Sequence, residues 1–98
     1  MKLERVLQYA QTLLEMSVSE GDIAVDATAG NGHDTLFLAN LVGDDGYVYA
    51  FDVQKEAVDA TLHRLLDNAL EHRAIVLKDG HENVANYIHK PVSAAIFN

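Results

Sequence analysis

The chain of 98 residues contains no cysteine and no tryptophan, and its one proline is Pro91. Without cysteine it cannot be one of the small folds that disulfides hold together. No apolar run approaches the roughly 20 residues that a membrane-spanning helix needs, so we expect no transmembrane segment. The first residues, with Glu4 among them, also lack the apolar stretch of a signal peptide. Hydrophobic residues make up 49% of the chain and charged residues 22%, which is typical of a folded, cytoplasmic globular domain.

Positive charge is scarce. Seven Lys and Arg stand against fifteen Asp and Glu, which gives a net charge of −8 with His neutral. Such a surface disfavours long-range attraction to phosphate. The charge is therefore compatible with a small-molecule site, or with an RNA-binding face built from residues outside this chain.

Apolar periodicity predicts strands that alternate with helices. An amphipathic helix over 3–16 is expected to cover a sheet. Alternation of this kind predicts an α/β fold of Rossmann-like type, with a parallel, doubly wound sheet and right-handed crossovers. The strands are expected at 23–27, 47–52, 74–77 and 92–97, and the helices between them at 34–41, 54–71 and 80–89.

A glycine-containing loop follows the first predicted strand, in the segment Asp26 to Thr35, which reads DATAGNGHDT. Gly30 and Gly32 allow a tight turn and a close approach of the backbone to a ligand. The helix that follows presents free N–H groups at its start. In open α/β sheets, ligands bind beyond the carboxyl ends of the strands, at the switch point of the topology. We therefore expect the ligand site at this loop.

The identity of the ligand depends on the residues around the glycines. A dinucleotide-binding loop requires Gly or Ala where this chain has Thr35, and no Gly-Lys-Ser/Thr of a P-loop is present. Asp26 precedes Gly30 by 30 − 26 = 4 positions. A carboxylate there can accept hydrogen bonds from a ligand ammonium and hold the amides of the loop, whereas it would repel a pyrophosphate. This favours a zwitterionic ligand such as S-adenosylmethionine. A nicotinamide-dependent oxidoreductase is the alternative.

Two further acids end the next strands. Asp52 is placed to accept hydrogen bonds from the hydroxyls of a ribose. Asp79 is placed to accept a hydrogen bond from the amino group of adenine. Simpler interpretations exist for two of the acids, because Asp34 can cap its helix and Asp79-Gly80 can be an ordinary turn. His33 and His81 without cysteine are a poor metal signal, so no metal is expected.

Four segments resemble one known family. They are DATAGNGHDT at 26–35, FDVQ at 51–54, KDGHEN at 78–83 and the terminal AAIFN. Together they resemble the bacterial "putative rRNA methylase" family of class I S-adenosylmethionine-dependent methyltransferases. The resemblance implies methylation of the aminomethyl group of a wobble 2-thiouridine in tRNA. Thr28 departs from the general methyltransferase pattern, in which many members have Gly.

The resemblance also assigns roles to residues of the three strand ends. It places Asp26, Asn31, Gly32 and Asp34 at the methionine end of the cofactor, Asp52 and Gln54 at the ribose, and Asp79 and His81 at the adenine. With the residues between and beside them, the candidate cofactor-binding set is Asp26, Thr28, Gly30, Asn31, Gly32, His33, Asp34, Thr35, Asp52, Val53, Gln54, Asp79, Gly80 and His81.

In this family Phe97-Asn98 opens the motif of the fourth strand, and more chain follows. Residues 1–98 are therefore expected to be the N-terminal, cofactor-binding part of one methyltransferase domain, truncated after the fourth strand. Asn98 is the candidate catalytic residue, since its side-chain oxygen would lie near the acceptor amine. We expect a sheet edge whose backbone groups are unpaired, and exposed apolar faces, so the chain should be marginally stable or pair with a second copy. A non-catalytic binding fragment is a further alternative.

Overall fold

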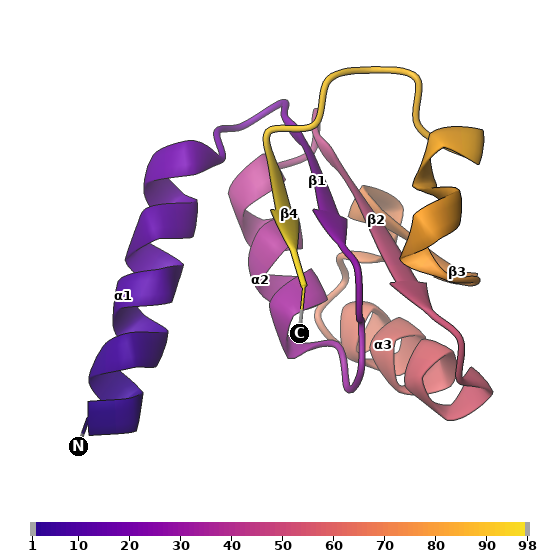
Figure 1. The fold of residues 1–98 in the computed structure, drawn as a ribbon, viewed down its shortest axis with the longest axis horizontal. Coiled ribbons are helices and arrows are strands. Elements are labelled where there is room, and N and C mark those ends of the chain that lie inside the picture. The colour runs from indigo at the N-terminus through magenta and orange to yellow at the C-terminus, as the bar shows by residue number, and fades with distance from the viewer. Residues whose placement is uncertain (1, 98) are drawn as a thin grey trace.

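A four-stranded parallel sheet forms the centre of the molecule, as the computed structural model shows for residues 2–97 (Figure 1). The strand order is β3-β2-β1-β4, and every neighbouring pair is parallel. This confirms the predicted α/β fold. The elements along the chain are α1 (Lys2–Ser17), β1 (Ile23–Asp26), α2 (His33–Val42), β2 (Tyr47–Asp52), α3 (Lys55–Asp67), the 3₁₀ helix η1 (Glu71–Arg73), β3 (Ala74–Lys78), the 3₁₀ helix η2 (His81–Asn86) and β4 (Ala94–Ile96).

The topology creates a switch point at β1. From β1 the chain moves outward to β2 and then β3, with α2 and α3 packed on one face of the sheet. It then crosses back to place β4 on the other side of β1, where Asp26 lies level with Ile96. The carboxyl end of β1, where the glycine loop begins, is therefore the place at which a crevice is expected in such sheets.

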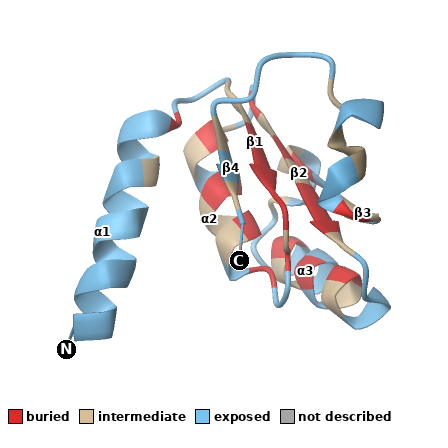
Figure 2. Ribbon diagram, viewed as in Figure 1, coloured by how far each residue is buried: buried red, intermediate tan, exposed pale blue. Residues whose placement is uncertain are grey.

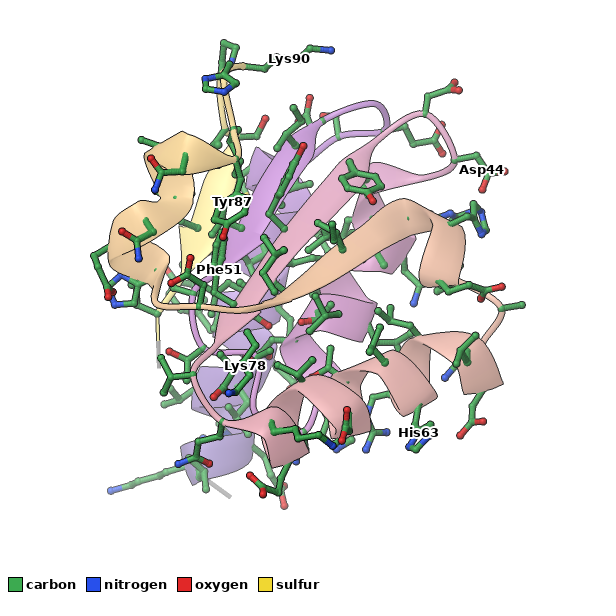
Figure 3. All side chains as sticks on the ribbon, turned by 90° about the vertical axis from the view of Figure 1, so that its right-hand side faces the viewer. Asp44, Phe51, His63, Lys78, Tyr87 and Lys90 are labelled. Atoms are coloured by element: carbon green, nitrogen blue, oxygen red, sulfur yellow. The ribbon has the colours of Figure 1, made fainter. Side chains whose placement is uncertain are left out.

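The two faces of the sheet are covered differently. Between the sheet and the helices α2 and α3 lies the main core, which is made by Ala24, Leu38, Ala39, Val42, Val48, Leu65 and Ala74 with Val18. Side chains alternate along a strand, so Phe51 faces the opposite side from Val48. There the ring of Tyr87 packs edge-on against Phe51, with ring centroids 5.7 Å apart (Figure 3). The segment between β3 and β4 thus covers part of the second face, on which Ile75 remains exposed.

Two predicted helices differ in the structure. The prediction of a helix over 80–89 was wrong, because only the 3₁₀ helix His81–Asn86 forms there. The Asp79 carboxylate accepts hydrogen bonds from Asn83 Nδ2 and Tyr87 Oη, both at 2.8 Å, and these bonds hold a tight turn in place of a regular helix. The helix predicted to reach residue 71 ends at Asp67, since Ala69 adopts a positive φ of 56° and reverses the chain.

The N-terminal helix does not cover the sheet as predicted. None of its residues is buried, and only the half-buried Leu14 and the following Val18 join the core (Figure 2). Leu7 and Leu13 remain 56% and 45% exposed, and they line a groove of about 880 Å³ between α1 and β4. The expected exposure of apolar side chains is therefore confirmed. Within residues 2–97, no helix has the length and apolarity that crossing a membrane requires.

Candidate functional site

The glycine loop has two glycines with different roles. Both have positive φ, 58° at Gly30 and 90° at Gly32, in the region that favours glycine. A Cβ on Gly30 would meet no atom within 4 Å, whereas a Cβ on Gly32 would lie 2.9 Å from Thr61 Cα. Gly30 therefore leaves open space beside the loop, as a ligand site requires, and Gly32 allows the loop to pack closely on α3.

Asp26 holds the start of the loop from inside the protein. It is fully buried, its Oδ1 accepts the Thr28 N–H at 3.2 Å, and its Oδ2 accepts the Thr35 hydroxyl at 2.7 Å. Burial raises the pKa of this carboxyl to about 6, although the two hydrogen bonds act in the opposite direction. The negative charges of Asp34 and Asp52 raise it further. Asp26 thus holds one amide of the loop, that of Thr28, and the hydroxyl of Thr35, and it is buried away from open space.

Asp52 joins the end of β2 to the glycine loop. Its Oδ2 accepts the Gly30 N–H and its Oδ1 accepts the Gln54 N–H, both at 3.0 Å. The side chain remains partly exposed. A carboxylate has about four lone-pair sites, so Asp52 retains acceptor capacity for a ligand after these two bonds.

Asp79 ends β3 and organises the turn after it. Besides Asn83 and Tyr87, the Gly80 N–H donates to Asp79 Oδ1 at 2.8 Å. The hydrogen bonds from Asn83, Tyr87 and Gly80 lower the pKa of this carboxyl below its ordinary value. Asp79 is therefore an ionised acceptor at neutral pH, and the predicted turn at Asp79-Gly80 is present as well.

The three strand ends meet at one cleft. It has a volume of about 220 Å³ and is lined by Ala27, Thr28, Asp52, Val53, Asp79, Gly80, His81 and Glu82. The structure thus brings together six of the predicted site residues. The cleft is smaller than the roughly 300–1,000 Å³ of pockets that enclose a whole small molecule, so it suits one part of a larger ligand.

The rest of the predicted set lies at the end of β1, along the loop, in the first turn of α2 and, for Gln54, at the N-cap of α3. His33 and Asp34 line the groove beside α1 rather than the cleft. The N-cap residue of α2 is Gly32, so Asp34 is not the N-cap residue and lies in the first turn of the helix. The rings of His81, which lines the cleft, and Phe97, which lines the groove, are in edge contact with centroids 5.1 Å apart. Asn98 lies outside the described residues.

Sequence reasoning missed two residues of α3. Arg64 Nε donates to the Asn31 carbonyl at 2.8 Å, and Thr61 Oγ1 donates to the Gly30 carbonyl at 3.4 Å. Thr61 is fully buried. No local motif marks either residue, because Arg64 is 33 positions from Asn31 and both occupy ordinary helix positions.

The order β3-β2-β1-β4, with a glycine loop at the switch point and acids on the neighbouring strand ends, defines the α/β fold of the S-adenosylmethionine-dependent methyltransferases. The model of the family described as "Putative rRNA methylase" matches residues 48–98, and the chain belongs to that family. A crystal structure of a "putative rRNA-methylase" from Clostridium thermocellum is 47% identical, with a TM-score of 0.91 over 93% of this chain. A "putative methyltransferase" from Streptococcus mutans, solved in complex with S-adenosylhomocysteine (SAH), is 35% identical over 91% of this chain, with a TM-score of 0.83.

A curated relative adds an RNA substrate to the comparison. The chloroplastic tRNA (mnm(5)s(2)U34)-methyltransferase of Arabidopsis thaliana is 40% identical over an alignment of 72 positions, and the match covers 68% of this chain. This chain spans 26% of that relative, 51% of the Clostridium protein and 48% of the Streptococcus protein. It therefore corresponds to about half the length of the solved relatives.

Proposed function

We propose that residues 1–98 form the cofactor-binding part of an S-adenosylmethionine-dependent RNA methyltransferase. One observation carries the proposal: the cleft bordered by Asp52 and Asp79 adjoins the glycine loop, whose Gly30 leaves open space at the switch point. The SAH complex of the Streptococcus mutans relative supports the same ligand class.

The cofactor would lie across the strand ends. Asp52 would accept the ribose hydroxyls with the acceptor capacity that Gly30 and Gln54 leave it. Asp79 and His81 would hold the adenine in the cleft, and Val53 would pack on it. The methionine end would follow Gly30, Asn31 and the start of α2, where free N–H groups favour a carboxylate. Asp26 would act on the ligand through Thr28 and Thr35, whose positions it fixes.

The bound cofactor supplies a methyl group on a sulfonium. In the transfer, the acceptor nitrogen would form the new N–C bond as the S–C bond breaks, the sulfur would keep the electron pair of the broken bond, and the proton that the nitrogen loses would pass to water. This in-line displacement needs correct positioning of the two reacting atoms and a neutral amine. We assign Asn98 the task of accepting a hydrogen bond from that amine, because it follows directly after β4 and Phe97.

We propose the aminomethyl group of a tRNA wobble 2-thiouridine as the acceptor. The name of the Arabidopsis thaliana relative supports this choice. With a net charge of −8, this chain offers RNA little attraction, so the phosphate-binding surface would lie in the part of the relatives that it does not span. An enzyme that acts on tRNA would work in the cytoplasm, or in an organelle that makes proteins.

We also propose that the chain pairs with a second copy along β4. This strand is at the edge of the sheet, and apolar side chains of α1 face the groove beside it. Sedimentation analysis should show a dimer, and Leu7→Asp should convert it to a monomer. A wild-type chain that is monomeric at every concentration would exclude this pairing.

Thermal-shift titration tests the cofactor assignment. Saturating S-adenosylmethionine or SAH should raise Tm, because a ligand at about 100 times its Kd stabilises the folded state by about 2.7 kcal/mol. For a domain of this size, each kcal/mol corresponds to roughly 4–8 °C. NAD at the same concentration should leave Tm unchanged. Stabilisation by NAD alone would favour an oxidoreductase, and no stabilisation by S-adenosylmethionine or SAH would contradict the cofactor assignment.

A further inference from the structure

The glycine loop is held from behind by α3. On that side, Arg64 Nε reaches the Asn31 carbonyl at 2.8 Å and Thr61 Oγ1 reaches the Gly30 carbonyl at 3.4 Å. Gly32 packs so closely on Thr61 that a methyl group would not fit between them. Three consecutive loop residues therefore depend on two side chains of one helix.

These contacts set the direction of the loop's peptide groups. In a trans peptide the C=O and the following N–H point in opposite directions, and the described chain has no cis peptide. Since the Gly30 carbonyl points toward Thr61, the Asn31 N–H points away from α3. The donor thus lies on the side of the loop that faces away from α3.

The part of the loop that α3 holds is separate from the nucleoside cleft. Residues 30–32 are absent from the lining of that cleft, which is formed by Thr28 and the ends of β2 and β3 among others. A change in α3 should therefore affect one end of an adenosyl ligand and spare the other. This expectation rests on the function proposed above.

We propose that Arg64 and Thr61 are positioning residues that fix the loop over 30–32 for the amino-acid end of the cofactor. Arg64 is the main one, because its charged donor makes the shorter bond and such bonds are the stronger kind. Neither residue need touch the cofactor, since both act through the carbonyls of the loop.

Calorimetry with two ligands on the chain of 98 residues tests this role. SAH has the amino-acid end, and 5′-methylthioadenosine lacks it. Arg64→Gln should weaken SAH binding about tenfold, the size expected for losing a charge-assisted hydrogen bond, and leave methylthioadenosine within about twofold. Thr61→Val, which keeps the shape of the side chain, should weaken SAH less and also spare methylthioadenosine.

Two variants serve as controls. Lys55→Gln removes the same charge from α3 at the exposed ion pair with Asp59. His63→Gln changes the residue next to Arg64, and the His63 side chain points away from the protein (Figure 3). Both should bind the two ligands as wild type does. Unchanged SAH binding in Arg64→Gln, or equal weakening of both ligands, would overturn the positioning role. A wild-type chain that binds neither ligand would overturn the proposed function itself and the positioning role with it.

Discussion

The Gly30 N–H donates a hydrogen bond to Asp52 Oδ2 over 3.0 Å, and this bond links the loop after β1 to the end of β2. The two residues are 22 positions apart in the chain. The other oxygen of the same carboxylate accepts the N–H of Gln54, directly before α3. One side chain therefore fixes the relative position of the glycine loop, the end of β2 and the start of α3. A ligand that binds Asp52 would meet a preorganised site.

Replacing Asp52 by Ala should weaken SAH binding. The variant loses the proposed ribose acceptor and releases Gly30, so we expect a loss of about 1–3 kcal/mol in binding free energy by calorimetry. Asp45→Ala is the matched control, because it removes an equal charge from the turn after α2. Equal affinity in Asp52→Ala and wild type would contradict the ribose assignment.

The two loop glycines should respond differently to alanine. Gly30→Ala places a methyl group in open space at φ 58°, so it should cost only the strain of the backbone, about 1–2 kcal/mol of unfolding free energy. The same methyl group should weaken SAH binding, because it occupies space beside the loop. Gly32→Ala adds an overlap with Thr61 to the same backbone cost, about 1–3 kcal/mol more. Urea denaturation should rank Gly32→Ala as the less stable variant. The reverse ranking would show that the packing of the loop on α3 is not tight.

The regular part of the fold was predictable because its signals are local. Short apolar runs that end in Asp26 and Asp52 mark buried strands, and the glycines between them mark a turn before a helix. The sequence therefore allowed the parallel sheet and the switch point to be predicted. The acids of the cleft and the glycine loop beside it follow from the same pattern, since carboxyl ends of parallel strands share one edge.

What could not be predicted depends on contacts between distant residues. The turn after β3 is held by Tyr87 on Asp79, 8 positions away, and its residues carry apolar spacing that suggested a helix. Arg64 and Thr61 look like ordinary helix residues until α3 is placed against the loop. For α1, periodicity correctly predicted a helix but could not show how little of its apolar side the chain covers.

The turn after β3 should open when Tyr87 is replaced by Phe. The ring can still pack on Phe51, but Asp79 loses the hydroxyl that donates to it at 2.8 Å. We expect faster amide hydrogen exchange over 80–90 and unchanged exchange in α2, measured by mass spectrometry. Tyr9→Phe, on the exposed α1, is the control and should change neither segment. Equal protection of 80–90 in Tyr87→Phe would show that packing alone holds the turn.

The buried carboxyl of Asp26 should make stability fall as pH rises through the mildly acidic range. Its pKa is about 6 in the folded protein against 3.8 ordinarily, so between these values the folded state binds more protons than the unfolded state. The free energy of unfolding then decreases with rising pH. The stabilisation that is complete below pH about 3.8 is lost above pH about 6, and it amounts to at most about 3 kcal/mol.

The stability of the wild-type protein must be compared with that of a variant, because Asp79, whose pKa is lowered, changes stability with the opposite sign at lower pH. Asp26→Asn should lack the decline that wild type shows in urea denaturation from pH about 4.5 to about 6.5. Parallel stability curves for the two proteins would mean that Asp26 titrates at its ordinary pKa.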